Sequence, residues 1–204
     1  LTMVRESRLR PWWTEYEDVL SSAYVGNEAG AVAIDTYAGL LVPDLLQVPE
    51  YTAMLARSQR RGERGVERMV AAFLKRQDAL ERDNMERYHA ILEEDALRRM
   101  SATPSLLHTQ LRRLIEVGTG HGNVVLRLLP TSAGLHAGSA GPFTVLEFDE
   151  GESSLAFVEA THGGAIVESE NGVAACQEVW RRLDETALGP DATITTLRRL
   201  SLLT

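Results

Sequence analysis

Apolar residues in the first 85 positions recur at the three- and four-residue spacing of amphipathic helices. A helix is expected from Asn27, as its cap, through Tyr37, and another is expected to begin at Pro49. The clearest stripe consists of Val66, Met69, Val70, Phe73, Leu74, Gln77 and Leu80, of which only Gln77 is polar. The pattern predicts that residues 12–85 form a helical part.

The pattern changes after residue 86 to short apolar runs separated by glycine-containing turns. The run 124–129 is almost continuously apolar and predicts a central strand. Further helices are expected after the caps Thr103, Asn171 and Asp191. The other expected strands are 88–93, 143–148, 155–159 and 165–168. This order predicts an α+β fold, in which an N-terminal helical half packs on a small, mostly antiparallel sheet that C-terminal helices close.

Composition places the chain among ordinary globular proteins. Its 204 residues suit a single domain, with 44% hydrophobic and 25% charged residues. No apolar run approaches the roughly 20 residues that span a bilayer, so no membrane contact is expected. Cys176 is the single cysteine, which excludes an internal disulfide and favours a reducing, cytoplasmic compartment.

The charge balance argues against nucleic-acid binding by this chain. Its 21 basic and 29 acidic residues give a net charge of −8, which repels phosphate backbones. The basic stretch from Arg57 to Arg76 is interpreted as a solvated helix face.

No motif predicts catalysis, a metal site or a cofactor. The five histidines lack zinc-protease spacing, and no serine stands in a nucleophile elbow. Cys176 lies on the apolar stripe of its expected helix and is interpreted as an inert core thiol. The segment 130–142 holds three glycines and no evident secondary structure, which fits either a binding loop around His136 or a surface connection.

Ten short motifs occur in order along nearly the whole chain. They are Trp13 with Tyr16, Glu28-Ala29, Val42-Pro43-x-Leu45-Leu46-Gln47-x-Pro49-Glu50-Tyr51, Arg76-Gln77, Glu94-x-Ala96-Leu97-Arg98, Gln110-Leu111, Val125-x-x-Leu128-Leu129-Pro130, Gly134-x-His136, Gly141-x-Phe143 and Val158-Glu159. In these motifs the chain resembles the C-terminal regulatory domain, a domain of unknown function, of actinobacterial XRE-type helix-turn-helix transcriptional regulators.

The resemblance implies a division of the chain. Residues 1–11 would be a linker from a helix-turn-helix domain that is absent here, and residues 12–204 a single regulatory domain, with a helical part over 12–85 and an α+β part over 86–204. DNA would be contacted only through the absent domain. Small partner proteins are often associated with such regulators, so the partner could be a protein or a small effector.

Several polar residues stand where the pattern expects apolar ones, and each needs a hydrogen-bond partner. They are Glu28, Gln47, Gln77, Glu94, Gln110 and His136. One interpretation is an internal polar network between the helical half and the sheet, and the other is a ligand pocket.

These observations predict a non-enzymatic sensor or interaction domain of a transcriptional regulator. The alternatives are a small-molecule enzyme and a pure dimerisation module. A homodimer is favoured if Trp12, Trp13 and Trp180 are exposed in one patch.

Overall fold

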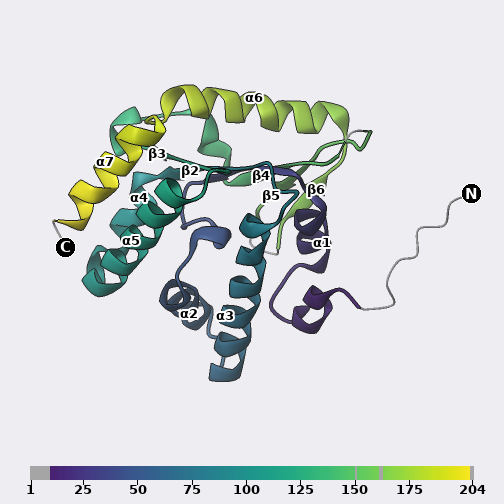
Figure 1. Ribbon diagram of the computed structural model, residues 1–204, viewed down its shortest axis with the longest axis horizontal. Helices are drawn as coiled ribbons and strands as arrows, with labels where there is room; N and C mark the ends of the chain where they lie inside the picture. The colour runs from purple at the N-terminus through teal and green to yellow at the C-terminus, as the bar shows by residue number, and fades with distance from the viewer. Residues whose placement is uncertain (1–9, 150, 161–162, 203–204) are drawn as a thin grey trace, which may run out of the picture.

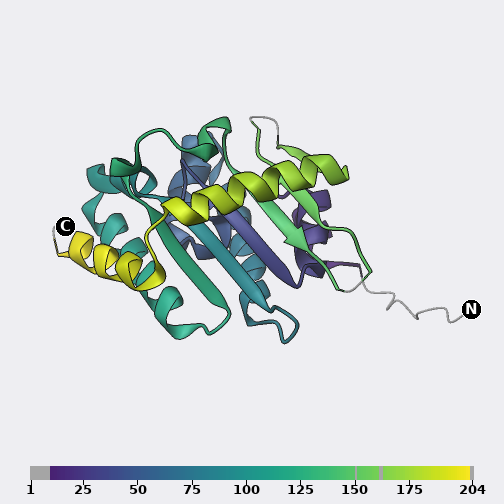
Figure 2. The same ribbon diagram turned by 90° about the horizontal axis from the view of Figure 1, so that it is seen from above.

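A six-stranded mixed sheet separates two layers of helices (Figure 1). The computed structural model describes residues 10–149, 151–160 and 163–202. One face of the sheet carries the helices α1 (Ser22–Gly30), α2 (Pro49–Ser58), α3 (Glu63–Gln77) and α5 (Pro104–Gly120). The long helix α6 (Glu170–Thr186) lies across the opposite face, as Figure 2 shows from above. The mixed α+β class expected from the sequence is therefore confirmed.

The strand order is β3-β2-β1-β4-β5-β6. The pairs β1–β2 and β2–β3 are parallel, and the pairs β1–β4, β4–β5 and β5–β6 are antiparallel, so the sheet is mostly antiparallel, as expected. The strands are β1 (Ala33–Ala38), β2 (Arg87–Glu93), β3 (Val124–Leu129), β4 (Phe143–Glu147), β5 (Leu155–Val158) and β6 (Ala165–Val167).

The predicted helix from Asn27 to Tyr37 is wrong. Helix α1 ends at Gly30, Asn27 lies inside it, and residues 33–38 form β1 in the middle of the sheet. Every residue of β1 is buried, because the strand has neighbours on both sides and helices on both faces. A strand buried on both faces lacks the alternation that distinguishes a strand from a helix. The helical half thus contributes a central strand.

Other predicted details also differ. The run 124–129 is a strand, but it lies at the edge of the sheet and not at its centre. Its continuous apolarity arises because α5 and α7 (Pro190–Ser201) pack against it on one face and α6 on the other. The caps of α6 and α7 are Ser169 and Gly189, not Asn171 and Asp191. Segment 130–142 contains two short 3-10 turns, η5 (Thr131–Ala133) and η6 (Ala137–Ala140).

The inner face of α3 is rotated slightly from the predicted stripe. Phe73 is buried as expected, whereas Leu74 is 44% exposed. Ala72 and Arg76 take buried positions instead, so a charged residue faces the interior.

The three tryptophans do not form one exposed patch. Trp12 and Trp13 pack beside Leu20 on the side of α1, whereas Trp180 is only 9% exposed and lies on the buried face of α6. In the described ranges we find no helix of the length and apolarity needed to cross a membrane.

Candidate functional site

A cavity of about 590 Å³ lies between the sheet and the helices α1 and α3. Side chains from β1 and β4 form one wall, and segment 39–45, which ends in the 3-10 turn η2 (Asp44–Leu46), forms another. Thr36 and Thr144 are neighbours on these two strands, and their hydroxyls lie 3.2 Å apart. The cavity volume is in the range of small-molecule sites.

A buried ion-pair cluster stands in the cavity wall. The Nε and Nη2 of Arg76 donate to the two carboxylate oxygens of Glu28 at 2.9 and 2.8 Å, and its Nη1 donates to Asp44 at 2.8 Å. The side chains of Arg76 and Glu28 are 5% and 3% exposed, whereas that of Asp44 is 40% exposed. The bidentate geometry satisfies Glu28 fully, which is how a buried carboxylate is tolerated.

This cluster sets the protonation state of the arginine. Burial alone would lower the pKa of the Arg76 guanidinium, but the charges of Glu28 and Asp44 outweigh burial and raise that pKa well above its usual value. The guanidinium therefore stays charged. Two carboxylates face this one cation.

Aromatic rings complete the wall next to Arg76. The guanidinium carbon lies 5.4 Å from the Tyr24 ring centroid and 5.1 Å from that of Phe73. The Tyr24 ring also packs against Phe157 of β5, with centroids 4.5 Å apart. Burial, and next the charge of Glu28, raise the pKa of Tyr24, so its hydroxyl stays protonated.

Glu159 lies at the mouth of the cavity, immediately after β5. Although its side chain reaches solvent, burial by the surrounding protein raises its pKa to about 7. The charge of Asp44 raises this pKa further, and that of Arg76 opposes the increase. Glu159 is therefore a carboxylate that exchanges protons near neutral pH.

The structure distributes the six predicted polar residues over three places. Glu28 is the one that lines the large cavity. Gln47, Gln77 and Gln110 surround η2, and Glu94 and His136 lie near the carboxyl ends of β2 and β3.

The three glutamines form an internal hydrogen-bond network. Gln110 accepts from the backbone N–H of Val48 at 2.9 Å and donates to the carbonyl of Leu46 at 2.8 Å. Gln47 donates to the carbonyl of Val42 at 2.8 Å. Gln77 donates to the carbonyl of Gln47 at 2.7 Å. These bonds hold the segment that carries Asp44, so the network supports the cavity wall.

The hydrogen bond from Gln77 to the Gln47 carbonyl is expected to contribute to the stability of the fold. Gln77→Leu removes the donor to the Gln47 carbonyl and is expected to lower the free energy of unfolding by about 1–3 kcal/mol, because a buried carbonyl loses its partner. Chemical denaturation of both proteins measures this difference. Gln59→Leu is the matched control, since Gln59 is exposed and lies at the end of α2. Equal stability of Gln77→Leu and the parent would contradict the network.

Of the last two predicted residues, His136 lines a second, smaller hollow, and Glu94 lies beside it without lining it. His136 Nε2 lies 3.3 Å from Glu93, which also accepts a hydrogen bond from the Tyr37 hydroxyl. Glu94 accepts from the backbone N–H of Thr131 at 3.2 Å. The hollow beside His136 and Glu93 has a volume of about 40 Å³, which is enough for little more than a water molecule.

The sequence analysis missed the ionic members of the large cavity. Asp44 and Glu159 had no assigned role, and the interpretation of the basic stretch from Arg57 to Arg76 as a solvated helix face is wrong for Arg76, which is 5% exposed and pairs with Glu28. A usable signal was present for Arg76, since it follows Met69 and Phe73 at spacings of seven and three residues and so lies on the buried face of α3.

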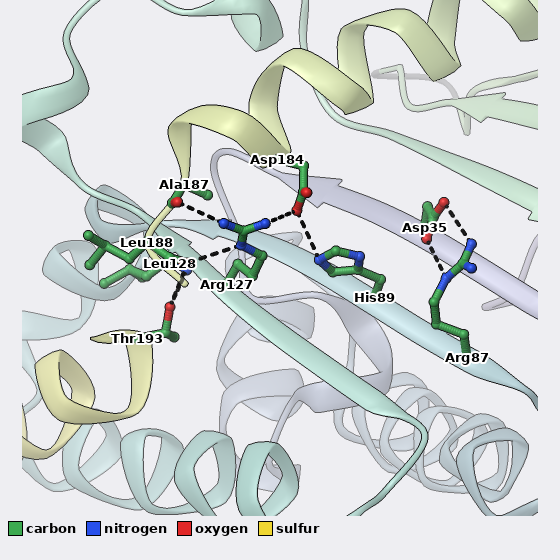
Figure 3. Close-up of polar contacts among 9 residues, drawn as sticks. All are labelled: Asp35, Arg87, His89, Arg127, Leu128, Asp184, Ala187, Leu188 and Thr193. Atoms are coloured by element: carbon green, nitrogen blue, oxygen red, sulfur yellow. Dashed lines mark hydrogen bonds and ion pairs between the residues drawn. The ribbon is translucent and has the colours of Figure 1, made fainter. Parts of the chain in front are cut away.

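A second polar cluster lies on the opposite face of the sheet, beneath α6 (Figure 3). Arg127 of β3 pairs with Asp184 of α6 and donates to the carbonyls of Ala187 and Leu188, both at 3.1 Å. His89 of β2 lies beside them, with its Nε2 3.3 Å from Asp184. Arg127 thus fastens the C-terminal end of α6 to the sheet.

His89 is held neutral in this cluster. Burial lowers its pKa to about 4, the charge of Asp184 opposes this shift, and those of Arg127 and Arg87 add to it. In the described part of the chain its Nε2 is the buried side-chain polar atom that lacks a well-aligned hydrogen bond.

His89 makes the stability depend on pH. Because the folded pKa lies below the unfolded value of about 6.5, the unfolded chain takes up the proton first, and stability is lost as the pH falls from about 6.5 to about 4. The loss is expected to reach at most about 3 kcal/mol. His89→Gln should remove this contribution, as measured by denaturation at several pH values. His108→Gln, at an exposed histidine, is the control, and an identical pH profile for His89→Gln and the parent would refute the assignment.

Within residues 10–149, 151–160 and 163–202, no group of three or more histidine, cysteine or acidic side chains is arranged to hold a metal ion.

Comparison with known proteins identifies a family for this chain. No curated protein matches the chain. Among solved structures, a match is TrmBL2, described as an archaeal chromatin protein with a novel mode of DNA binding, at 13% identity and a TM-score of 0.37. The match covers 81% of this chain and 48% of the other, so the chain spans about half the length of TrmBL2, and the likeness is too low to support a conclusion. The model of the family described as "Domain of unknown function (DUF5753)" matches residues 21–199. The chain therefore belongs to the DUF5753 family.

Proposed function

We propose that this chain is the non-enzymatic sensor domain of a DNA-binding transcriptional regulator of the XRE type, and that it binds a small effector in the large cavity. The cavity of about 590 Å³ is the observation that carries the proposal. Its mixture of apolar walls with a few fixed polar groups is the usual composition of a small-molecule site. The regulator context comes from the resemblance in the ten motifs, and DNA would be contacted by the helix-turn-helix domain of such a regulator.

The walls of the cavity suit signal transmission. They come from α1, α3, the segment 39–45 and the sheet, and Arg76 joins the first three through Glu28 and Asp44. A ligand that contacts this cluster would shift α1 relative to α3, because both depend on the same guanidinium. Binding energy could then bias the position of a domain attached before α1.

A rim variant tests whether the cavity is the binding site. Ser21 lines the cavity and is exposed, so Ser21→Trp is expected to close the entrance without disturbing the core. Ala23→Trp is the matched control, because Ala23 is exposed in the first turn of α1, which Ser21 precedes, and does not line the cavity. The assay is a thermal-shift screen of a small-metabolite library against the three proteins.

The expected result is a set of compounds that raise the Tm of the parent and of Ala23→Trp but not of Ser21→Trp. Compounds that stabilise all three proteins equally would place binding elsewhere. In the corresponding full-length regulator, the same compounds should change operator occupancy in a reporter assay. Compounds that bind without any such effect would argue against a sensor.

A further inference from the structure

The Arg76 cluster in the wall of the large cavity carries more negative than positive charge. Arg76 carries one positive charge and contacts both Glu28 and Asp44. Glu28 is satisfied by the bidentate contact, whereas Asp44 accepts from the guanidinium through one oxygen and from Gln47 Nε2 at 3.1 Å through the other, and its side chain is 40% exposed. The cluster therefore carries one more negative than positive charge, on the partly exposed carboxylate of Asp44, which lines the cavity.

Glu159 adds to this surplus from across the cavity. No described residue forms an ion pair or a side-chain hydrogen bond with its carboxylate, although it lines the same space. Its backbone N–H donates to the carbonyl of Pro142 at 3.3 Å, which holds the residue in line with β5. Glu159 therefore lines the cavity as an exposed carboxylate that has no counter-ion among the described residues.

The aromatic pair stands next to this carboxylate. Phe157 and Glu159 are two positions apart on an extended segment, so their side chains project from the same face of the sheet. The ring of Phe157 contacts that of Tyr24, and both rings line the cavity. Aromatic faces beside carboxylates form favourable surroundings for organic cations.

On the basis of the proposed function, we propose that the effector is an organic cation, a protonated amine carried on a flat apolar body. Glu159 and Asp44 bind the ammonium group, and Tyr24 and Phe157 contact the apolar body. The ammonium group compensates the negative charge that Asp44 and Glu159 bring to the cavity.

Arg99 provides an internal control for this assignment. It lines the cavity and is exposed, and no described residue pairs with it. It follows β2 in the chain whereas Glu159 follows β5, and β1 and β4 lie between these strands. The two unpaired charges therefore lie on opposite sides of the cavity, and neutralising either one tests the sign of the ligand's charge.

Three probes with the same ring system separate the effects of charge from those of shape. Tryptamine is cationic, tryptophol is neutral and indole-3-acetate is anionic. Isothermal titration of the whole chain with each probe, at millimolar concentrations, measures the dissociation constants for the parent, Glu159→Gln and Arg99→Gln. The Tm of each variant verifies that it folds, and both changes are at exposed positions.

We expect tryptamine to bind at least about tenfold more tightly than the other two probes, since a hydrogen bond to a charged group is worth about 1.5–3 kcal/mol. Glu159→Gln should weaken the binding of tryptamine by about the same factor. Arg99→Gln should leave its affinity equal or improve it. Ser21→Trp should abolish binding.

Three results would overturn the cation assignment: tighter binding of tryptophol or indole-3-acetate, unchanged tryptamine affinity in Glu159→Gln, and no binding of tryptamine. If tryptophol or indole-3-acetate binds more tightly and Ser21→Trp abolishes that binding, the cavity remains an effector site, but for a ligand of different charge. The proposed sensor function is contradicted by a separate result, namely that every compound in the metabolite screen that stabilises the parent also stabilises Ser21→Trp.

Discussion

Replacing Arg76 with methionine is expected to lower the free energy of unfolding by about 3–5 kcal/mol, because Glu28 then remains as a buried carboxylate without its partner. The expected loss is larger than that of a surface ion pair, which contributes about 0–1 kcal/mol. Asp44 is partly exposed and can be hydrated, so most of the effect comes from Glu28. Denaturant unfolding of the variant and the parent gives the difference directly.

The double variant Glu28→Leu/Arg76→Met is the control. It removes both buried charges, and replacement of a buried pair by apolar residues of similar volume is often close to neutral. The double variant should therefore be more stable than Arg76→Met alone. If the single variant loses less than about 1 kcal/mol, water reaches Glu28 and the pair is not buried as described.

Phe73→Ala is expected to cost about 3–5 kcal/mol, because it removes a buried aromatic ring from the inner face of α3. The ring packs with Val66 and Met69 of the same helix and lies 5.1 Å from the Arg76 guanidinium, so packing and cation–π contact are lost together. Thermal and denaturant unfolding both report the loss. Leu74→Ala, at the neighbouring and 44% exposed position, should cost much less. Similar losses for the two variants would mean that the helix faces are wrongly assigned.

The sequence predicted the elements whose hydrophobic pattern has a clear period. Strands β2 and β4 were expected within one residue of their observed ends, and the stripe from Val66 to Leu80 identified α3 with a shift of three residues at each end. In each of these elements, the apolar residues of the segment itself identify at least one buried face. The class of the fold followed from the order of these elements.

The strand β1 could not be recognised because its environment is set by distant residues. Its alanines favour a helix when considered alone, and only the neighbours β2 and β4 make an extended conformation favourable. The same dependence on distant residues explains why the strand 124–129 was expected at the centre of the sheet and lies at its edge. Its apolar pattern reports coverage by α5, α7 and α6, which buries four of the six residues of this edge strand.

The candidate site was only partly predictable. Polar residues within apolar stretches identified Glu28 and the glutamine network, since a buried polar group needs a partner. Glu159 lies in a segment with no such contrast, and its role depends on a cavity formed by segments far apart in the sequence. Sequence reasoning finds the residue that is unusual in its own segment and misses the residue that is unusual only in three dimensions.

The central position of β1 also has a consequence for the order of events during synthesis. Thr36 on this strand contacts Thr144, 108 positions later in the chain. The helices α1 to α3 are therefore complete on the ribosome long before the strand that closes their cavity has been translated. Contacts of such long range slow folding, since the chain must close large loops before it gains their energy. The large cavity would therefore be completed only late in synthesis, after its helices have formed.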